Sequence, residues 1–351
     1  MRRRQFVHSY NYITSLDNLL EAWKEFLVGK RSRKDVQEFE LRLMSNIISL
    51  HRDLATKKYR HSSYQAFNIS DPKPRNIHKA GVRDRLLHHA LYRVLYPFFD
   101  RTFIVDSYSC RIGKGTHRAL DRFRTFGRKV SRNNTRAAWV LKCDIKKFFA
   151  SIDQVKLTGI ISRYIPDPDI RWLINQIVSS FHSTERGRGL PARASQWRAG
   201  LPLGNLTSQL FVNIYMNKFD QYAKHILKAK YYIRYADDFV FLCDNKSWLE
   251  SLIPDIRRFL IEKLNLELHP HKVFLKTLTS GVDFLGWVHF PDHRVLRTTA
   301  RRRMEHRLVE HPTKETLQSY LGLISHGNTN KLKSRILAYN NYEEDAGDSQ
   351  E

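Results

Sequence analysis

Cysteine is scarce in this chain of 351 residues, and Cys110, Cys143 and Cys243 lie far apart. The sequence contains no CxxC pair and no histidine at ligand spacing from a cysteine, which argues against a disulfide framework and a zinc site. No segment approaches the roughly 18 apolar residues that a membrane span requires. The basic start MRRRQF leads into no apolar run, so we expect no targeting signal and no membrane partner.

Acidic residues are also few, with 35 Asp and Glu against 60 Lys and Arg and a formal net charge of +25. Such an excess goes beyond what solubility needs and indicates a polyanionic partner, with nucleic acid as the leading candidate. A ribosome-like or membrane-surface basic protein is the alternative, but no long amphipathic Lys-rich helix favours a membrane. The 42% hydrophobic content is enough for a globular protein with real cores.

Apolar periodicity predicts a mixture of helices and strands and an α+β fold class. We expect two helices in residues 1–60, and a strong helix in residues 83–100 that Pro97 helps to end. Further helices are expected at 207–227 and 247–266, and the basic segment 293–337 is also expected to be helical. Strands are expected at 137–144, as a hairpin at 231–243, and as short strands within 271–290 separated by Ser280 and Gly281.

Three acids stand at the ends of these predicted strands. Asp144 follows an apolar strand, where an isolated Asp is more often a cap or a turn former. Asp237 and Asp238 lie between the apolar halves of YYIRYADDFVFLC, where carboxylates are costly unless cations or hydrogen bonds compensate. Two magnesium ions about 3.5 to 4 Å apart would neutralise three such carboxylates and suit oxygen ligands. Together with the basic charge, this pattern indicates phosphoryl transfer.

The motifs around these acids resemble, in content and in order, those of reverse transcriptases. They are, in chain order, RDRLLHHAL, RIGKGTHRAL, LKCDIKKFFASID, LPLGNLTSQ, YADD, LNLELHPHK and FLGW. The resemblance runs from about Pro72 to Trp287 and implies RNA-directed DNA polymerase activity. It also implies a right-hand architecture with an antiparallel palm sheet packed by helices.

This resemblance divides the chain into parts. The expected parts are an N-terminal helical extension at 1–60, fingers with the start of the palm at 61–140, a palm at 141–290, a basic helical thumb at 291–340 and a disordered acidic tail at 341–351.

Carried over by motif, Asp144, Asp237 and Asp238 would hold two Mg²⁺ ions, with Mn²⁺ as a substitute and the backbone of Ile145 lining the site. Phe149 stands where the family places an aromatic gate that excludes the 2′-hydroxyl, although an ordinary core aromatic is the alternative. Lys272 stands where the family carries a general acid for departing pyrophosphate, although it can equally be a surface lysine.

The resemblance also implies two sets of binding residues. The nucleotide would contact Arg75, Arg83, Arg111, Lys114, Phe149, Leu203, Gly204 and Gln209. The primer and template would contact the grip turn and the thumb through Phe284, Leu285, Gly286, Trp287, Arg297, Arg301 and Arg302. For each basic residue a solvated surface is the competing interpretation, and Trp287 can equally be a core anchor.

Within the family, Leu203 before Gly204, and Ser208 with Gln209 after it, resemble the reverse transcriptases of diversity-generating retroelements, which copy template adenines with errors. An aliphatic residue in place of the more usual Gln would discriminate base pairs less well, although Leu203 can also repack the loop with normal fidelity. Group II intron-like bacterial enzymes are the other near resemblance.

The implied partners are an RNA template, a DNA or RNA primer and dNTPs, with a structured template RNA and a small basic accessory protein as further candidates. The implied location is the cytoplasm, in a bacterial, phage or archaeal setting. Two alternatives stay open at this point. One is a defence-associated or unassigned reverse transcriptase that mutagenises no target. The other is a non-catalytic, maturase-like RNA-binding protein, which the intact set of three acids argues against.

Overall fold

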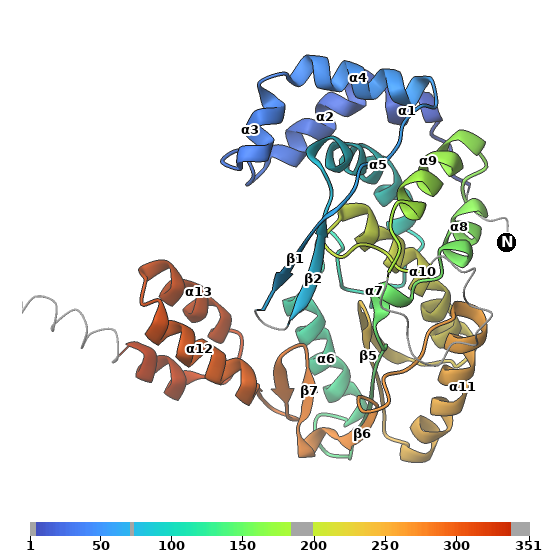
Figure 1. The fold of residues 1–351 in the computed structure, drawn as a ribbon. Helices are drawn as coiled ribbons and strands as arrows, with labels where there is room; N and C mark the ends of the chain where they lie inside the picture. Colours follow the sequence, from blue (N-terminus) through green and yellow to red (C-terminus); the bar gives the residue numbers. More distant parts are fainter. Residues whose placement is uncertain (1–4, 71–73, 184–198, 338–351) are drawn as a thin grey trace, which may run out of the picture.

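The computed structural model describes residues 5–70, 74–183 and 199–337, so the tail predicted at 341–351 lies outside the described residues. In this part of the chain, helices surround three antiparallel sheets, and the predicted α+β class is confirmed (Figure 1). None of the helices described is both long enough and apolar enough to cross a membrane.

The N-terminal segment forms four helices, so the prediction of two was wrong. They are α1 (Tyr10–Thr14), α2 (Leu16–Leu27), α3 (Lys34–Glu40) and α4 (Leu43–Ala55). Ser15 separates the first two because its backbone is extended and its hydroxyl accepts a hydrogen bond from the Asn18 N–H, which caps α2. Helices α1, α2 and α3 pack on α5 (Val82–Asp100), and α4 packs on these three helices.

Helix α5 continues through Pro97 to Asp100, so this proline does not end the helix as predicted. Pro97 lies in the last turn, where its missing N–H removes one hydrogen bond of the ladder and leaves the rest intact.

A two-stranded hairpin of β1 (Gln65–Ile69) and β2 (Arg75–Lys79) precedes α5 and reaches toward the large sheet (Figure 1). Its residues are mostly exposed, so they lack the apolar alternation from which a strand is predicted. Helices α8 (Gln154–Ser162) and α9 (Pro168–Ser179) were also not predicted. Asp153 and Asp167 cap them by accepting hydrogen bonds from backbone N–H groups of their first turns.

The central sheet has the strand order β4-β5-β3-β6 and is antiparallel throughout. Its strands are β3 (Trp139–Asp144), β4 (Tyr231–Tyr235), β5 (Asp238–Cys243) and β6 (Phe274–Thr277), which confirms the predicted strand and hairpin. The short helix α7 (Phe148–Ser151) follows β3 closely.

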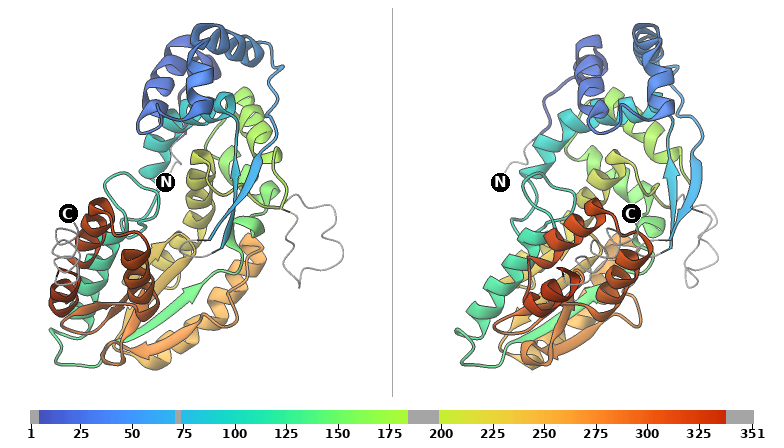
Figure 2. Two further views of the ribbon diagram at one scale, coloured as in Figure 1. Left: turned by 60° about the vertical axis from the view of Figure 1, so that its left-hand side comes forward. Right: turned by 90° about the vertical axis from the view of Figure 1, so that its left-hand side faces the viewer.

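Successive side chains of these strands enter two different cores. Leu141 and Phe239 belong to the core shared with α10 (Leu206–His225) and α11 (Lys246–Leu264). Val140 and Val240 belong to the core shared with α6 (Thr116–Val130) and the C-terminal segment. Figure 2 shows α11 and the C-terminal helices on different sides of the strands. The two faces of the sheet therefore pack against different parts of the chain.

A third sheet has the order β7-β8-β9, formed by β7 (Val282–Phe284), β8 (Trp287–His289) and β9 (Arg294–Leu296), and the 3-10 helix η2 (Leu278–Ser280) precedes it. Strand β9 corrects the prediction that residues 293–337 are wholly helical. Helices α12 (Thr298–Glu310) and α13 (Lys314–Ile324) follow. Leu285 and Gly286 form the two-residue turn between β7 and β8, with φ values of 52° and 86°.

The C-terminal segment rests on Trp287, which is 2% exposed and lies directly against Gly327. We expect Gly327→Ala to destabilise the protein by about 1–3 kcal/mol, because the new Cβ would overlap the Trp287 ring. Gly322→Ala is the matched control, since nothing lies within 4 Å of its Cβ and Ala is the better helix former. Denaturation monitored by circular dichroism would measure both, and equal stability of the two variants would contradict this packing.

Candidate active site

Three acids gather at one end of the central sheet. Asp144 ends β3 and Asp238 begins β5, and their Cα atoms are direct partners across the two strands. Asp237 lies in the turn between β4 and β5, and its carbonyl accepts a hydrogen bond from the Ile145 N–H at 3.2 Å. Because paired residues of an antiparallel ladder share a face, the Asp144 and Asp238 side chains lie on the same side of the sheet as Val140 and Val240. The convergence predicted from sequence is therefore present in the fold.

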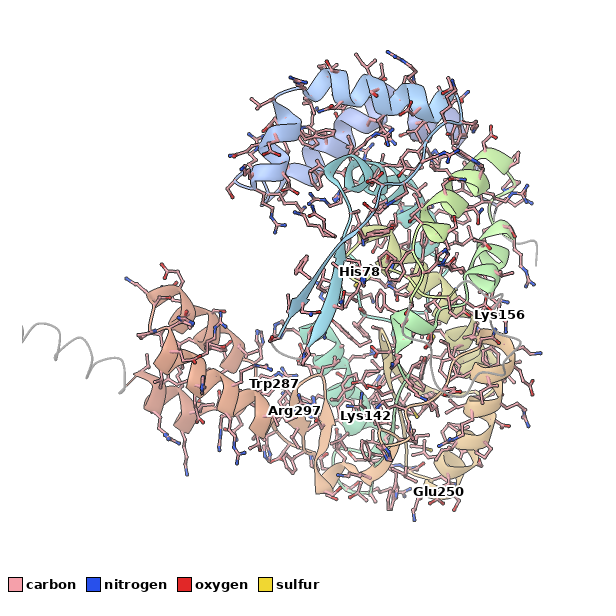
Figure 3. All side chains as sticks on the ribbon, viewed as in Figure 1. His78, Lys142, Lys156, Glu250, Trp287 and Arg297 are labelled. Carbon is pink, nitrogen blue, oxygen red and sulfur yellow. The ribbon has the colours of Figure 1, made fainter. Side chains whose placement is uncertain are left out.

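Two lysines supply positive charge to these acids. The Lys272 ammonium lies 3.0 Å from Asp144 Oδ1, and the Lys142 ammonium lies 3.2 Å from Asp238 Oδ2. Lys142 also donates to the Asp283 carbonyl at 2.8 Å. Figure 3 labels Lys142 together with Trp287 and Arg297, all on the side of the sheet that faces the C-terminal helices. Lys142 was missed from sequence, although it lies two residues before Asp144 and so on the same strand face.

The buried, negatively charged surroundings of the acids favour the binding of a cation. Burial, together with the negative charge of Asp144, raises the pKa of Asp237. Burial raises the pKa of Asp238 to about 7, against the opposing effect of Lys142. Asp238 Oδ1 is buried and has no hydrogen-bond partner among the described residues. Since carboxylate oxygens are the ligands that Mg²⁺ prefers, the donor set fits a divalent ion of this kind.

The described residues include no group of three or more His, Cys, Asp or Glu side chains already arranged to hold a metal ion. Lys142 forms an ion pair with Asp238, and Lys272 forms one with Asp144. The ammonium groups therefore balance part of the negative charge of the three neighbouring acids. Binding of a divalent ion would require these lysines to yield at least part of their contacts.

The β1–β2 hairpin and the LPLG loop meet near the acids. The positive charge of Arg75, at the start of β2, is near enough to oppose the rise in the pKa of Asp237. The Leu203 carbonyl accepts from the His78 N–H at 3.1 Å, and Gly204, with φ of 102°, lies against Ile77. These contacts fix the loop to β2.

The same loop is tied to the start of the palm. The Leu201 N–H donates to the Phe149 carbonyl at 2.9 Å, and Phe149 is half-buried on the short helix α7. Gln209 lies in the first turn of α10, directly after the loop, where its N–H donates to the Asn205 carbonyl at 3.3 Å.

Arg111 and Lys114, which the sequence assigned to the nucleotide, have partners inside the protein. Arg111 donates to Asp100 at 2.7 Å and to the carbonyls of Ile104 and Ser107, and its side chain is only 6% exposed. Lys114 donates to the Val105 carbonyl at 2.9 Å. These residues hold the loop before α6.

Arg83, also assigned to the nucleotide from sequence, is likewise bound to other residues of the protein. Its guanidinium forms a 2.6 Å ion pair with Asp53 and lies over the ring of Tyr59, which ties α5 to the N-terminal helices. The structure therefore brings Arg75 toward the acids and engages Arg83, Arg111 and Lys114 elsewhere.

The predicted grip turn carries its residues in two environments. Phe284 and Trp287 are buried in the core beneath α6, which agrees with the core-anchor interpretation of Trp287, while Leu285 and Gly286 form the turn itself. Arg297 pairs with Asp283 at 3.0 Å, and Arg301 lies 3.7 Å from Glu305. Arg302 is exposed on α12.

A buried ion pair behind the acidic turn was also missed. Arg234 donates from Nε and Nη2 to both oxygens of Asp220, each at 2.7 Å, and both side chains are fully buried. Its Nη1 donates to the Ala236 carbonyl at 3.1 Å. Ala236 has φ of 55°, a left-handed conformation that is strained for alanine. The pair could have been suspected from sequence, because Arg234 lies inside an apolar strand and Asp220 inside an apolar helix.

Comparison with known proteins places this site in a family. The family described as reverse transcriptase (RNA-dependent DNA polymerase) matches residues 70–289, a span of more than half of the chain that contains all three acids. The chain therefore belongs to the reverse transcriptase family. Membership agrees with the right-hand polymerase architecture expected from the motifs, and with the α+β fold observed.

Two relatives illustrate the range of the family. The chain is 26% identical to the protein YkfC of Escherichia coli (strain K12) over 265 residues, which cover 66% of each protein. It is 22% identical to the group II intron-encoded protein LtrA of Lactococcus lactis subsp. cremoris over 289 residues, covering 63% of this chain but only 44% of LtrA. The chain thus spans less than two thirds of the length of these relatives. A structure of apo telomerase from Candida tropicalis, truncated from the C-terminal domain, aligns over 72% of this chain and 60% of its own at 14% identity, with a TM-score of 0.45.

We expect Arg234→Lys to destabilise the protein by about 3 kcal/mol or more, because lysine keeps the charge but cannot bind both oxygens of buried Asp220. Chemical denaturation would measure the change. Arg258→Lys is the matched control: Arg258 pairs with Asp255 on the exposed surface of α11, where the loss should stay within about 0.5 kcal/mol. Equal effects of the two substitutions would show that the buried pair does not hold the fold.

Proposed function

We propose that this protein synthesises DNA on an RNA template by nucleotidyl transfer. The observation that carries the proposal is the cross-strand pairing of Asp144 with Asp238 beside Asp237, at the site where a reverse transcriptase family member would bring together its catalytic acids. The oxygen-only donor set and the adjoining basic groups suit a phosphoanhydride substrate.

Asp144, Asp237 and Asp238 would hold two Mg²⁺ ions, or Mn²⁺ as a substitute, with the backbone of Ile145 lining the site. When bound, such ions polarise a phosphoryl oxygen and lower the pKa of a primer hydroxyl. Asp238 pairs with Lys142 and burial raises its pKa, so we assign it mainly to orienting the site. Lys272, 3.0 Å from Asp144, would give a proton to departing pyrophosphate once Asp144 releases its ammonium group.

The remaining contacts divide between the nucleotide and the nucleic acid. Arg75 would approach the triphosphate from the hairpin, with Leu203, Gly204 and Gln209 beside the base pair and Phe149 beneath the sugar. The turn at Leu285 and Gly286 would support the primer end, and Arg297, Arg301 and Arg302 would meet the duplex backbone. The corresponding parts are fingers at 61–140, palm at 141–290 and thumb at 291–340, with RNA, primer and dNTPs as partners in a cytoplasmic setting.

We expect Asp237→Asn to lower primer extension on an RNA template by about 10³-fold or more, because the metal site would lose a charged ligand worth several kcal/mol. Extension would be measured with the four dNTPs and Mg²⁺. Asp244→Asn, at the opposite and exposed end of the same hairpin, is the matched control and should extend normally. Normal extension by Asp237→Asn would overturn the assignment of the site.

We further propose that the enzyme is the error-prone polymerase of a diversity-generating retroelement, with a structured template RNA and a small basic accessory protein as partners. The support is Leu203, on a loop that is bound to β2, with Ser208 and Gln209 following at the start of α10. An aliphatic side chain at this position contacts a base pair without the directional hydrogen bond of an amide, so mismatched pairs would be rejected less strongly.

We expect Leu203→Gln to reduce misincorporation opposite template adenines about tenfold, which is the discrimination that one contact of this size supplies. Sequencing of the cDNA made by the wild type and the variant would measure it. Errors at the other three template bases serve as the internal control and should change little. Uniform fidelity in the wild type would instead favour a reverse transcriptase that does not mutagenise a target, such as a defence-associated enzyme.

A further inference from the structure

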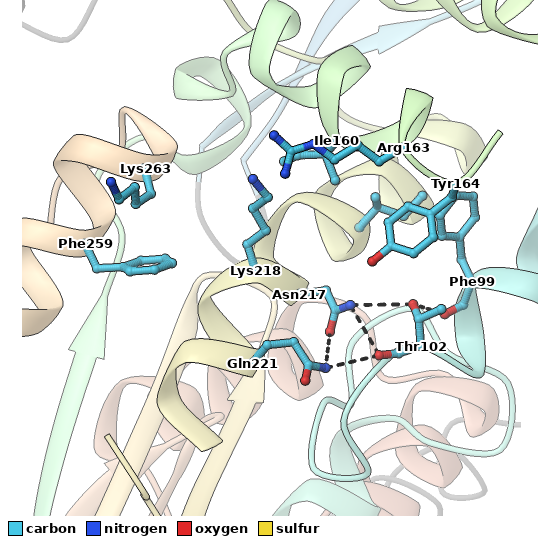
Figure 4. Close-up of a pocket in the computed structure, with 11 residues that line it drawn as sticks. Phe99, Thr102, Ile160, Arg163, Tyr164, Asn217, Lys218, Gln221, Phe259 and Lys263 are labelled. Atoms are coloured by element: carbon cyan, nitrogen blue, oxygen red, sulfur yellow. Dashed lines mark hydrogen bonds between the residues drawn. The ribbon is translucent and has the colours of Figure 1, made fainter. Parts of the chain in front are cut away.

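A cavity of about 370 Å³ opens on the side of the central sheet opposite the acids. Its walls come from the end of α5 and from α8, α10 and α11 (Figure 4). Helices α10 and α11 share a core with Leu141 and Cys143, whereas Asp144 and Lys142 alternate with these residues and face the other way. This cavity is therefore separate from the candidate active site.

Cations and aromatic rings line this cavity together. Lys218 and Lys263 come from α10 and α11, and Arg163 caps the end of α8. None of the eleven lining residues, all within the described part of the chain, is an Asp or Glu. Arg163 and Lys263 are exposed at the mouth. The cavity thus has a positive rim, which favours an anionic ligand.

The walls of the cavity are held in place before any ligand arrives. Phe259 stacks on Tyr222 with ring centres 4.2 Å apart, and Tyr164 packs edge-to-face on Phe99 at 5.6 Å. The floor is a hydrogen-bonded set in which Asn217 and Gln221 both donate to the Thr102 carbonyl at 3.2 Å (Figure 4). Rigid aromatic walls reduce the entropy lost when a planar ligand is bound.

We propose that this cavity binds one unpaired nucleotide of a single-stranded RNA segment. Arg163, Lys218 and Lys263 would hold its phosphate groups, and the base would lie against Tyr164 and Phe259. Unstacked RNA bases are bound by aromatic rings in this way, and a volume of about 370 Å³ falls in the range of single-ligand pockets. The proposal rests on RNA being a partner, as in the proposed function, and it extends the RNA path to the back of the palm.

The first test uses the full chain and a fluorescent 12-nucleotide single-stranded RNA, with binding followed by anisotropy at several salt concentrations. We expect the double variant Arg163→Ala/Lys263→Ala to bind about tenfold more weakly. The slope of log affinity against log salt should fall by about 1.4, because each lost phosphate contact in a single strand accounts for about 0.7. Lys58→Ala/Arg171→Ala removes one exposed Lys and one exposed Arg elsewhere and should behave as the wild type. Identical affinity and slope in the two double variants would overturn the site.

The second test separates the base from the phosphate by using an RNA of the same length with abasic residues. Weaker binding of the abasic strand by the wild type, with little difference between the two strands in the Arg163→Ala/Lys263→Ala variant, supports a nucleotide site. Equal binding of both strands by the wild type overturns it, as does displacement of the RNA from the wild type by an acidic peptide that the double variant does not bind.

Primer extension on a short pre-annealed RNA–DNA duplex distinguishes this proposal from the polymerase proposal. The Arg163→Ala/Lys263→Ala variant should extend the duplex at the wild-type rate, because the altered residues lie behind the sheet. A wild type that binds RNA at the cavity but extends no primer would refute the polymerase alone. A wild type that extends primers while the double variant binds RNA normally would refute the cavity alone.

Discussion

Arg234 and Asp220 form a fully buried, two-pronged ion pair between strand β4 and helix α10, and the acidic turn is built directly on it. The guanidinium uses its third nitrogen to hold the Ala236 carbonyl, which fixes a residue in a strained left-handed conformation. Removing one partner from a buried pair costs about 3–5 kcal/mol, more than the strain that the pair offsets. The position of Asp237 therefore depends on charges that never reach solvent.

The same pair joins parts of the chain that lie far apart in sequence. Arg234 also donates to the Ser107 hydroxyl at 3.1 Å, and its backbone pairs with the loop that precedes α6. Arg111 and Lys114 hold that loop through Asp100 and the Val105 carbonyl. A basic motif that resembles a nucleotide-binding loop thus acts, in this structure, as the brace beside the turn. The family resemblance assigned these residues to the nucleotide, but the sequence could not show that their side chains are bound to protein partners.

Much of the site was predictable because it lies on strands with clear alternation. β3 and the β4–β5 hairpin can be predicted directly from apolar runs next to acids. Their antiparallel pairing brings Asp144 beside Asp238. The β1–β2 hairpin was not predicted because most of its side chains are exposed, so its sequence has no apolar period to detect. Lys142 and Asp220 were missed for a different reason. Their importance comes from partners more than ten residues away, Asp283 and Arg234, which only the folded chain reveals.

The lysines at the acids explain how three carboxylates can be assembled before substrate arrives. Burial raises the pKa of Asp237 and of Asp238, and the negative charge of Asp144 adds to the rise in both. Lys272 and Lys142 limit the cost by pairing with Asp144 and Asp238, which lets the palm fold with the carboxylates in register. A divalent ion brings more positive charge than either ammonium to the same oxygens, so it can take over this neutralisation. Lys272, 42% exposed, is the more readily released of the two, and in the proposed reaction its release would leave a cationic acid beside Asp144.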